Sequence, residues 1–309
     1  MTVITTTDLT KQYRSETAVN GLDLEIQDGE VYGFLGPNGA GKSTTISMLM
    51  DYVRPTAGTA RILGYDPRDD VVEIHQRVGI LPDRFSVYER LTGRRHLNYV
   101  IDSKNASDTP EELLARVGLS DAIDRQAGTY SNGMQQRLGV AMALVGSPDL
   151  LILDEPFTGL DPHGARTIRN IVYEENDRGA AVFFSSHVLG QVELVCDRIG
   201  ILDDGNLIAE GRIDDLREQV AVESSLRFML DHVPSGLDET LRAQDGVVKV
   251  TEDGNQVVVV TRGSNARWPV IQTIENTAAS VVSFTIHEPS IEDVFIAHTT
   301  GRVESERSV

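Results

Sequence analysis

The most informative stretch of this 309-residue chain is Gly36-Pro37-Asn38-Gly39-Ala40-Gly41-Lys42-Ser43. It fits the pattern Gly-x-x-x-x-Gly-Lys-Ser, in which backbone N–H groups surround phosphate at the start of a helix. The apolar stretch from Glu30 to Leu35 predicts a strand before the loop, and helical spacing from Lys42 to Met50 predicts a helix after it. Because the motif requires this strand–loop–helix context, the sequence predicts an α/β fold with an ATP site at the loop.

The residue types in this loop suit the phosphates of ATP. Glycines let successive N–H groups turn inward, the Lys42 ammonium group reaches the β- and γ-phosphates, and the Ser43 hydroxyl binds Mg²⁺. The alternative, a glycine-rich turn that happens to precede Lys-Ser, does not account for the flanking elements. The residues expected to bind ATP here are Gly36, Pro37, Asn38, Gly39, Ala40, Gly41, Lys42, Ser43 and Thr44.

A second motif places two carboxylates, Asp154 and Glu155, at the end of the apolar run 150–153. Strands of a parallel sheet deliver the residues at their carboxyl ends to the ligand crevice. We expect Asp154 to hold Mg²⁺ through water and Glu155 to polarise the attacking water. Acidic residues after a strand are common in loops, so the motif is weak alone. Together with the phosphate loop it predicts ATP hydrolysis.

The remaining pattern of the first two thirds predicts a parallel sheet with helices on both faces. The runs 150–153 and 181–184 are continuously apolar, as buried parallel strands are. From about 87 to 145 the pattern is mostly helical, with candidate N-caps at Thr92, Thr109 and Ser131. We therefore expect an ATP-binding domain over 1–219, with a helical subdomain inserted into its α/β core.

The last third predicts a separate small domain over 220–309. A polar stretch near 217–224 marks the boundary, and the patterns that follow have the order βαββαβ, with Asp253-Gly254-Asn255 as a hairpin turn. This order predicts a ferredoxin-like α+β module. A final helix is expected to start at Ser290, capped by its hydroxyl, with Asp293 reaching back to the Ser290 N–H.

Composition excludes several classes of protein. The net charge of −19, with only four Lys among 28 basic residues, argues against a nucleic-acid partner. The lone Cys196 cannot form an intrachain disulfide and fits a reducing interior. Met1 to Asp8 does not resemble a signal peptide, and no apolar run reaches the roughly 18 residues of a membrane-spanning helix. The acidic, Lys-poor surface indicates either a very salty host cytoplasm or a moderately acidic cytosolic protein.

Five motifs in order identify a family. The phosphate loop, the signature segment (residues 130–137, Tyr-Ser-Asn-Gly-Met-Gln-Gln-Arg), the strand ending in Asp-Glu, Gly159-Leu160-Asp161 and the lone His187 after an apolar strand follow one another along the chain. From about Val3 to Gly211 the sequence resembles the nucleotide-binding subunit of ATP-binding cassette transporters. The resemblance implies the P-loop NTPase cassette fold.

The resemblance implies roles for five further residues. Tyr13 is similar to the aromatic residue that stacks on adenine; the less favoured alternative is an ordinary tyrosine beside a strand. Ser131 and Gly133 resemble the donors that contact the γ-phosphate of ATP bound to the opposite subunit, and Asp161 would lie at the dimer seam. His187 resembles the histidine that contacts the γ-phosphate and steadies the attacking water.

Two departures from the usual family pattern indicate a subgroup. The signature is commonly Leu-Ser-Gly-Gly-Gln, whereas Tyr130, Asn132 and Met134 stand at its first, third and fifth positions, and Asp83 replaces a Gln. Asn132 tolerates unusual backbone angles, so the turn is expected to keep its conformation. The Asp83 carboxylate can still accept a hydrogen bond from a metal-bound water. Both changes, and the sequence of residues 288–295, resemble the corresponding segments of drug- and antibiotic-exporter ATPases. The expected metal ligands are Ser43, Asp83 and Asp154.

The resemblance implies an ATPase that uses ATP and Mg²⁺ and powers an exporter through separate transmembrane permease subunits. A second ATP-binding subunit would complete each site head to tail, as a homodimer or heterodimer, at the cytoplasmic face of the cell membrane. An importer subunit, a soluble cassette protein acting on ribosomes or DNA, and a nucleotide-binding module without turnover remain as alternatives. The sequence does not identify the transported substrate.

Overall fold

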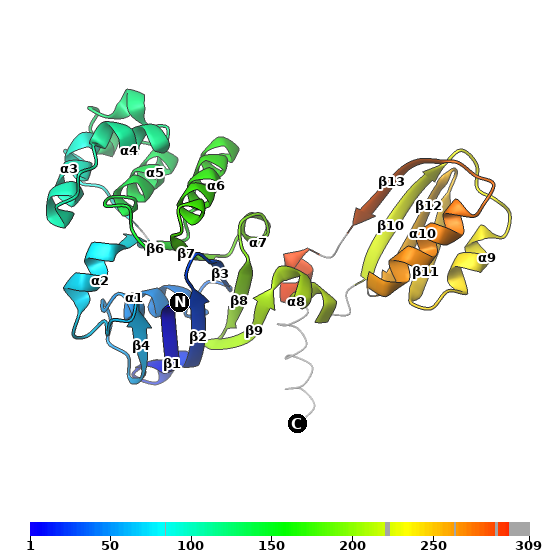
Figure 1. The fold of residues 1–309 in the computed structure, drawn as a ribbon, viewed down its shortest axis with the longest axis horizontal. Coiled ribbons are helices and arrows are strands. Elements are labelled where there is room, and N and C mark those ends of the chain that lie inside the picture. Colours follow the sequence, from blue (N-terminus) through cyan, green and yellow to red (C-terminus); the bar gives the residue numbers. More distant parts are fainter. Residues whose placement is uncertain (84, 220–222, 263, 288–289, 297–309) are drawn as a thin grey trace. The chain divides into compact units, whose positions relative to one another are not determined.

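The computed structural model describes residues 1–83, 85–219, 223–262, 264–287 and 290–296 (Figure 1). The chain forms two compact units, Met1–Arg212 and Ile213–Val309. The expected domain limit after residue 219 falls slightly later than this division and stays a prediction. Each unit is described separately below.

A six-stranded sheet forms the centre of the first unit. Its strands are, in spatial order, β5 (Val78–Leu81), β6 (Leu150–Asp154), β7 (Ala181–Ser186), β3 (Val31–Leu35), β8 (Arg198–Asp203) and β9 (Asn206–Arg212). The first five are parallel to their neighbours, and β9 pairs with β8 in antiparallel fashion. Every residue of β3, β6 and β7 is buried, so the prediction of a mostly parallel, covered sheet is confirmed.

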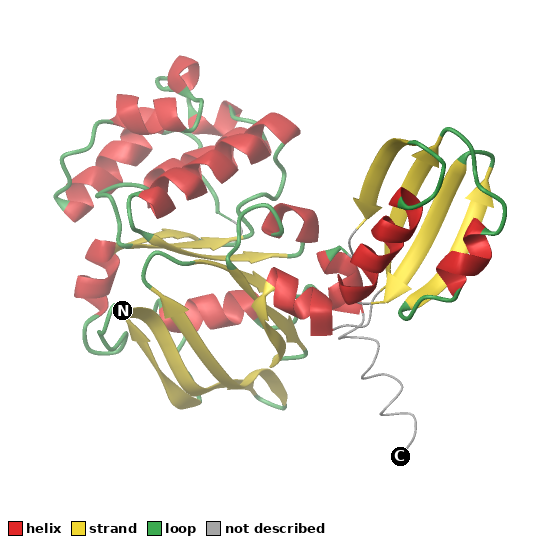
Figure 2. Ribbon diagram, turned by 45° about the vertical axis from the view of Figure 1, so that its right-hand side comes forward, coloured by secondary structure: helices red, strands yellow, loops and turns green. Residues whose placement is uncertain are grey.

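A second, antiparallel sheet was not expected from the sequence, although the alternation of Leu22, Leu24 and Ile26 with polar residues does predict one of its strands. Its order is β2 (Glu16–Gln27), β1 (Thr2–Tyr13) and β4 (Ala57–Ile62). The helix after the phosphate loop, α1 (Lys42–Leu49), lies between the two sheets (Figure 2). One apolar core joins these layers, and it includes Ile4, Ile26, Ile46 and Phe183. The phosphate loop therefore rests on a core packed from both sheets.

The inserted helices lie together above the six-stranded sheet in Figure 2. They are α3 (Gly93–Lys104), α4 (Pro110–Arg116) and α5 (Asn132–Ala143), with short 3-10 turns at Ser120–Ala122 and Ala127–Thr129. The hydroxyls of Thr92, Thr109 and Ser131 accept the expected N-cap bonds. The other helices of this unit are α2 (Val71–Arg77), α6 (Pro162–Asp177) and α7 (Leu189–Val192).

The second unit contains the predicted βαββαβ order. After α8 (Ile213–Gln219) come β10 (Glu223–Leu230), α9 (Leu237–Arg242), β11 (Val247–Asp253), β12 (Gln256–Arg262), a 3-10 turn (Ser264–Ala266), α10 (Arg267–Glu275) and β13 (Val281–His287). The sheet is antiparallel with order β11-β12-β10-β13, as in a ferredoxin-like fold. The Ser290 hydroxyl accepts from the Asp293 N–H and the Asp293 carboxylate from the Ser290 N–H, which confirms the capping box. Glu288 and Pro289 lie outside the described residues.

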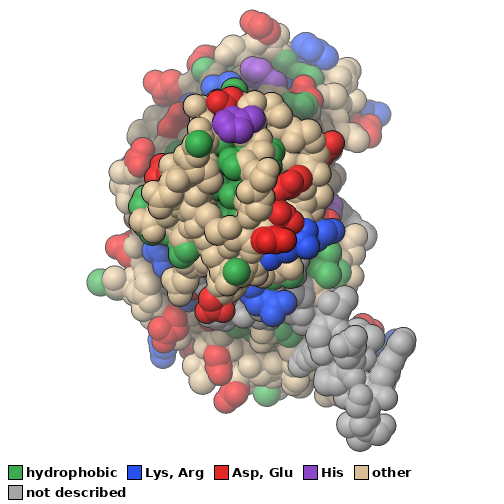
Figure 3. Space-filling model, turned by 90° about the vertical axis from the view of Figure 1, so that its right-hand side faces the viewer, with side chains coloured by type: hydrophobic (Ala, Val, Ile, Leu, Met, Phe, Trp, Pro, Cys, Tyr) green, Lys and Arg blue, Asp and Glu red, His purple; other side chains and the backbone are tan. Residues whose placement is uncertain are grey.

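Charge is spread over the surface. Figure 3 shows carboxylate side chains scattered around one face, with smaller groups of Lys and Arg between them. Within the described part of the chain, no helix is both long and apolar enough to cross a membrane.

Candidate functional site

Strand register brings the predicted motifs to one edge of the six-stranded sheet. Leu35, the last residue before the phosphate loop, pairs with Ser186, which directly precedes His187. Asp154 pairs with Ser185 on the next strand. The chain leaves β5 just before Asp83 at the same edge. Parallel strands thus place segments that are far apart in sequence side by side at their carboxyl ends.

The phosphate loop needs glycine where the backbone is tight or left-handed. Gly41 has φ 108°, and a Cβ there would lie 2.3 Å from the Ala18 carbonyl oxygen. A Cβ at Gly36 would lie 2.4 Å from the Leu202 carbonyl oxygen. Both contacts are with backbone, which cannot move aside cheaply. These two glycines therefore fix the path of the loop against β2 and β8.

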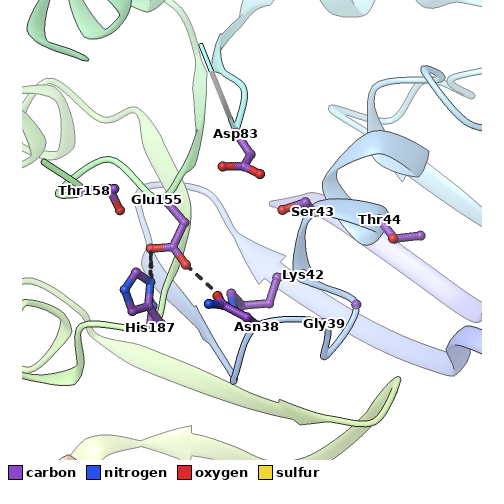
Figure 4. A pocket seen from close by; sticks show the side chains of 10 residues that line it. Asn38, Gly39, Lys42, Ser43, Thr44, Asp83, Glu155, Thr158 and His187 are labelled. Atoms are coloured by element: carbon purple, nitrogen blue, oxygen red, sulfur yellow. Dashed lines mark hydrogen bonds and ion pairs between the residues drawn. The ribbon is translucent and has the colours of Figure 1, made fainter. Parts of the chain in front are cut away.

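Three predicted groups meet above the loop. Lys42 Nζ lies 3.6 Å from Glu155 Oε1, and His187 Nδ1 lies 2.8 Å from Glu155 Oε2 (Figure 4). The buried Lys42 ammonium group also donates to the carbonyl oxygens of Gly36 and Pro37, at 2.7 and 3.1 Å. The Glu155 carboxylate is thus held between a cation and an imidazole.

These groups line a cavity of about 470 Å³, which we call the phosphate cavity. Its lining comprises Asn38, Gly39, Gly41, Lys42, Ser43, Thr44, Asp83, Glu155, Thr158 and His187. In Figure 4 the Asp83 carboxylate faces the Ser43 side of the cavity. Ala40 is instead part of the apolar core beneath the loop.

Asp154 is buried directly beside the phosphate cavity. Its carboxylate accepts hydrogen bonds from the hydroxyls of Ser185 and Ser43. Burial raises its pKa above the ordinary value of 3.8 and outweighs the lowering effect of the two hydroxyls; the nearby charges of Asp83 and Glu155 raise it further. The structure therefore holds an ionised Asp154 at a cost in stability.

Asp154→Asn should make the protein more resistant to urea at neutral pH in the presence of a chelator. Below pH 3.8 the carboxyl is protonated in both folded and unfolded chains and costs nothing. As the pH rises through the raised folded pKa, the parent loses stability because its buried group must ionise, whereas Asn does not titrate. Urea denaturation of both proteins across this pH range measures the difference between their free energies of unfolding. A difference that stays constant with pH, or a variant less stable than the parent, would contradict the raised pKa of Asp154.

The oxygen ligands present suit Mg²⁺. The Ser43 hydroxyl is within hydrogen-bond reach of the Asp154 carboxylate, and Asp83 lines the same cavity. Among the described residues no cluster of three or more His, Cys, Asp or Glu forms a ready-made metal cage. Mg²⁺ commonly binds through one or two carboxylates together with substrate phosphates, so this donor set fits a metal bound together with ATP.

The signature residues lie in a different hollow, of about 400 Å³. Ser131, Gly133 and Asp161 line it together with Gly159. Ser131 caps α5, and Asp161 caps α6 by accepting the Gly164 N–H at 2.7 Å. None of these residues lines the phosphate cavity, so within the described chain the two halves of the expected site stay apart.

Tyr13 lies at the end of β1 and is about half exposed, with Lys11 Nζ 4.8 Å from its ring centre. It is not among the described residues that line the phosphate cavity. Its expected stacking on adenine therefore stays a prediction.

Sequence reasoning missed three residues beside Glu155. Thr158 lines the phosphate cavity, the Ser185 hydroxyl accepts the Glu155 N–H at 3.0 Å, and the Gln136 amide donates to the Glu155 carbonyl oxygen at 3.0 Å. Ser185 precedes His187 closely, which could have drawn attention to it. Nothing in the spacing of Gln136 predicts its contact.

Comparison with known proteins gives the family. Residues 19–158 match the family model described as ABC transporter, and residues 211–299 match the C-terminal domain of DrrA1-3-like ATP-binding proteins. Over 99% of its length the chain is 36% identical to the daunorubicin/doxorubicin resistance ATP-binding protein DrrA of Streptomyces peucetius, covering 94% of that protein. The chain belongs to the ABC transporter family. The motif-based resemblance is thereby confirmed.

Other relatives place this ABC protein among the drug- and antibiotic-exporter ATPases. The bacitracin transport ATP-binding protein BcrA of Bacillus licheniformis is 36% identical, with 96% of both chains covered. A solved ATP-binding subunit of an ABC transporter is 30% identical, with a TM-score of 0.66 over 70% of this chain and 92% of the other. A dimeric cassette in a post-hydrolysis state with ADP and Pi, 23% identical over 68% of this chain and 98% of its own, shares the fold, with a TM-score of 0.63.

The chain is thus the ATP-hydrolysing subunit of an ABC exporter, and it acts through a separate membrane-spanning partner. ABC cassettes of this kind work as dimers. The comparisons do not bear on the salt hypothesis, which stays a prediction.

Proposed function

We propose that the phosphate cavity binds Mg²⁺-ATP and that Glu155 is the general base for its hydrolysis. The observation that carries this proposal is the position of the Glu155 carboxylate between Lys42 and His187. An ionised carboxylate only accepts hydrogen bonds, so the His187 Nδ1–H donates to it. Glu155 Oε1 faces Lys42 and the cavity, where an attacking water would lie.

The remaining site residues position and neutralise charge, as phosphoryl transfer requires. The Lys42 ammonium group, now on the Gly36 and Pro37 carbonyl oxygens, can turn to the β- and γ-phosphates. Ser43 and Asp154 would hold Mg²⁺, directly and through water, with Asp83 as a further candidate. When bound, Mg²⁺ neutralises developing charge on the phosphate oxygens.

We further propose that two such chains associate head to tail and that the hollow at Ser131, Gly133 and Asp161 completes the partner's site. The support is that these three residues line one hollow together and that none of them is among the described residues lining the chain's own phosphate cavity. A homodimer is the simplest arrangement, and Ser131 and Gly133 of each copy would contact the γ-phosphate held by the other. The pair would sit at the cytoplasmic face of the membrane on its permease.

The names of two relatives suggest the cargo. One is a daunorubicin/doxorubicin resistance protein and the other a bacitracin transport protein. We propose that the complex of this chain and its permease exports a drug- or antibiotic-like molecule.

Purification of the tagged protein from host membranes, and co-expression with any membrane protein that co-purifies or is encoded by a neighbouring gene, test the proposal. We expect the two proteins to co-purify, Mg²⁺-dependent phosphate release from ATP, and raised resistance of a sensitive host to an exported compound. Phosphate release without any co-purifying membrane protein would favour a cassette unconnected with transport. ATP binding without phosphate release would leave only a nucleotide-binding module.

A further inference from the structure

Gln136 connects the signature helix to the proposed general base within one chain. Its side-chain amide donates to the carbonyl oxygen of Glu155 at 3.0 Å. A carbonyl oxygen can only accept, so the amide nitrogen must be the atom that faces it. The contact joins α5, in the helical subdomain, to the loop directly after β6 in the core.

The backbone that receives this bond has an unfavourable conformation. Glu155 has φ 52°, in the left-handed region that residues with a Cβ seldom adopt. Its N–H is held from the other side by Ser185, at 3.2 Å to the carbonyl oxygen and 3.0 Å to the hydroxyl. Strained residues persist at functional sites only where their surroundings hold them. Ser185 holds the N–H of Glu155, and Gln136 holds the carbonyl oxygen together with the Thr158 N–H, which donates to that oxygen at 3.2 Å.

The first turn of α5 touches the same loop a second time. A Cβ at Gly133 would lie 3.1 Å from the Gly159 carbonyl oxygen, so the helix start packs closely on the segment after Glu155. Gln136 lies three residues beyond Gly133 and five beyond Ser131, roughly 5 and 8 Å along the helix axis. The helix start and the Glu155 carbonyl are therefore joined by a short, rigid piece of structure.

We propose that Gln136 is a positioning residue through which each α5 couples the two ATP sites of the dimer. This inference rests on the proposed function, in which Ser131 and Gly133 contact the ATP held by the other copy. A shift of α5 on contact with that nucleotide moves Gln136, and with it the Glu155 backbone of its own site. Each carboxylate thus reaches its working position when the opposite site is filled.

Gln136→Met tests the coupling, with Gln76→Met as the matched control. Methionine keeps the length and volume of glutamine but cannot donate a hydrogen bond. Gln76 is an exposed residue of α2, and it lines neither the phosphate cavity nor the hollow of the signature residues. Gln136→Asn, whose amide is one methylene too short, serves as a second variant.

The measurements are steady-state phosphate release over a range of ATP concentrations and equilibrium binding of a fluorescent ATP analogue. For both Gln136 variants we expect kcat to fall roughly 10- to 100-fold with unchanged analogue affinity, because the carboxylate is misplaced and the phosphate loop is intact. The Hill coefficient should fall toward one. Gln76→Met should retain the parental values.

Parental kcat and Hill coefficient in the Gln136 variants would overturn the inference, as would an equal loss in Gln76→Met. An equal fall in analogue affinity would also overturn it, because it would indicate general damage to the fold. A parent protein without ATP turnover would instead refute the proposed function on which the inference rests.

Discussion

Replacing Glu155 by Gln is expected to lower ATP hydrolysis by roughly 10²- to 10⁴-fold while ATP binding persists, since general-base catalysis contributes about that much. Gln has the same shape as Glu but cannot accept a proton. The hydrogen bonds to the backbone N–H and carbonyl oxygen of residue 155 come from Ser185, Gln136 and the Thr158 N–H, and none of them involves the carboxylate. The variant should therefore fold as the parent does.

The Glu155→Gln variant should also accumulate as an ATP-bound dimer, because closure no longer leads to hydrolysis. Phosphate release measures the first effect, and size-exclusion chromatography with and without Mg²⁺-ATP measures the second. Glu25→Gln, which alters an exposed carboxylate on β2, is the matched control and should behave as the parent. Undiminished turnover in Glu155→Gln would remove the assigned base and require another group in the phosphate cavity.

The sequence predicted the parts of the site that follow from strand ends. Glu155 and His187 come directly after continuously apolar strands, and such strands are parallel, buried and end at a common edge. The side-chain caps at Thr92, Thr109 and Ser131 are also local features, since each hydroxyl bonds an N–H three residues later. Features that depend on only a few neighbouring residues could thus be predicted from the sequence.

The antiparallel sheet could not be predicted from the sequence in the same way. Its strand β1 has register shifts between Thr6 and Leu9 and again between Leu9 and Lys11, and Asp8 has φ 49°. Such bulges break the alternation of apolar and polar residues on which strand prediction depends. The threonine-rich start of the chain was therefore not recognised as a strand.

The contacts of Gln136 and Ser185 were missed for a different reason. Each contact joins elements that are far apart in the chain. The position of their shared partner, the Glu155 backbone, depends on a left-handed conformation that no pattern of residue types predicts. For Asp154, burial raises the pKa, an effect that depends on packing around β6 and not on its neighbours in sequence. These details decide how the carboxylates work, and only the folded chain contains them.

Mixing two inactive variants should restore activity if each ATP site is shared between two chains. Lys42→Ala removes the buried ammonium group that bonds the Gly36 and Pro37 carbonyl oxygens and reaches for phosphate. Ser131→Arg places a bulky cation in the hollow of the signature residues. Each variant alone should lose nearly all phosphate release, because both sites of its homodimer carry a defect.

A mixed dimer is different, because a two-fold arrangement assigns the phosphate loop of one chain and the signature of the other to each site. One site then carries both defects, and the other combines an intact Lys42 with an intact Ser131. Random pairing makes about half of the dimers mixed, with one sound site in two, so phosphate release should return to at most about a quarter of the parental rate. Coupling through Gln136 would lower this value further but not to zero. If every mixing ratio stays inactive while each variant still binds ATP or associates, the two halves of the site do not come from opposite chains, and the head-to-tail arrangement is wrong.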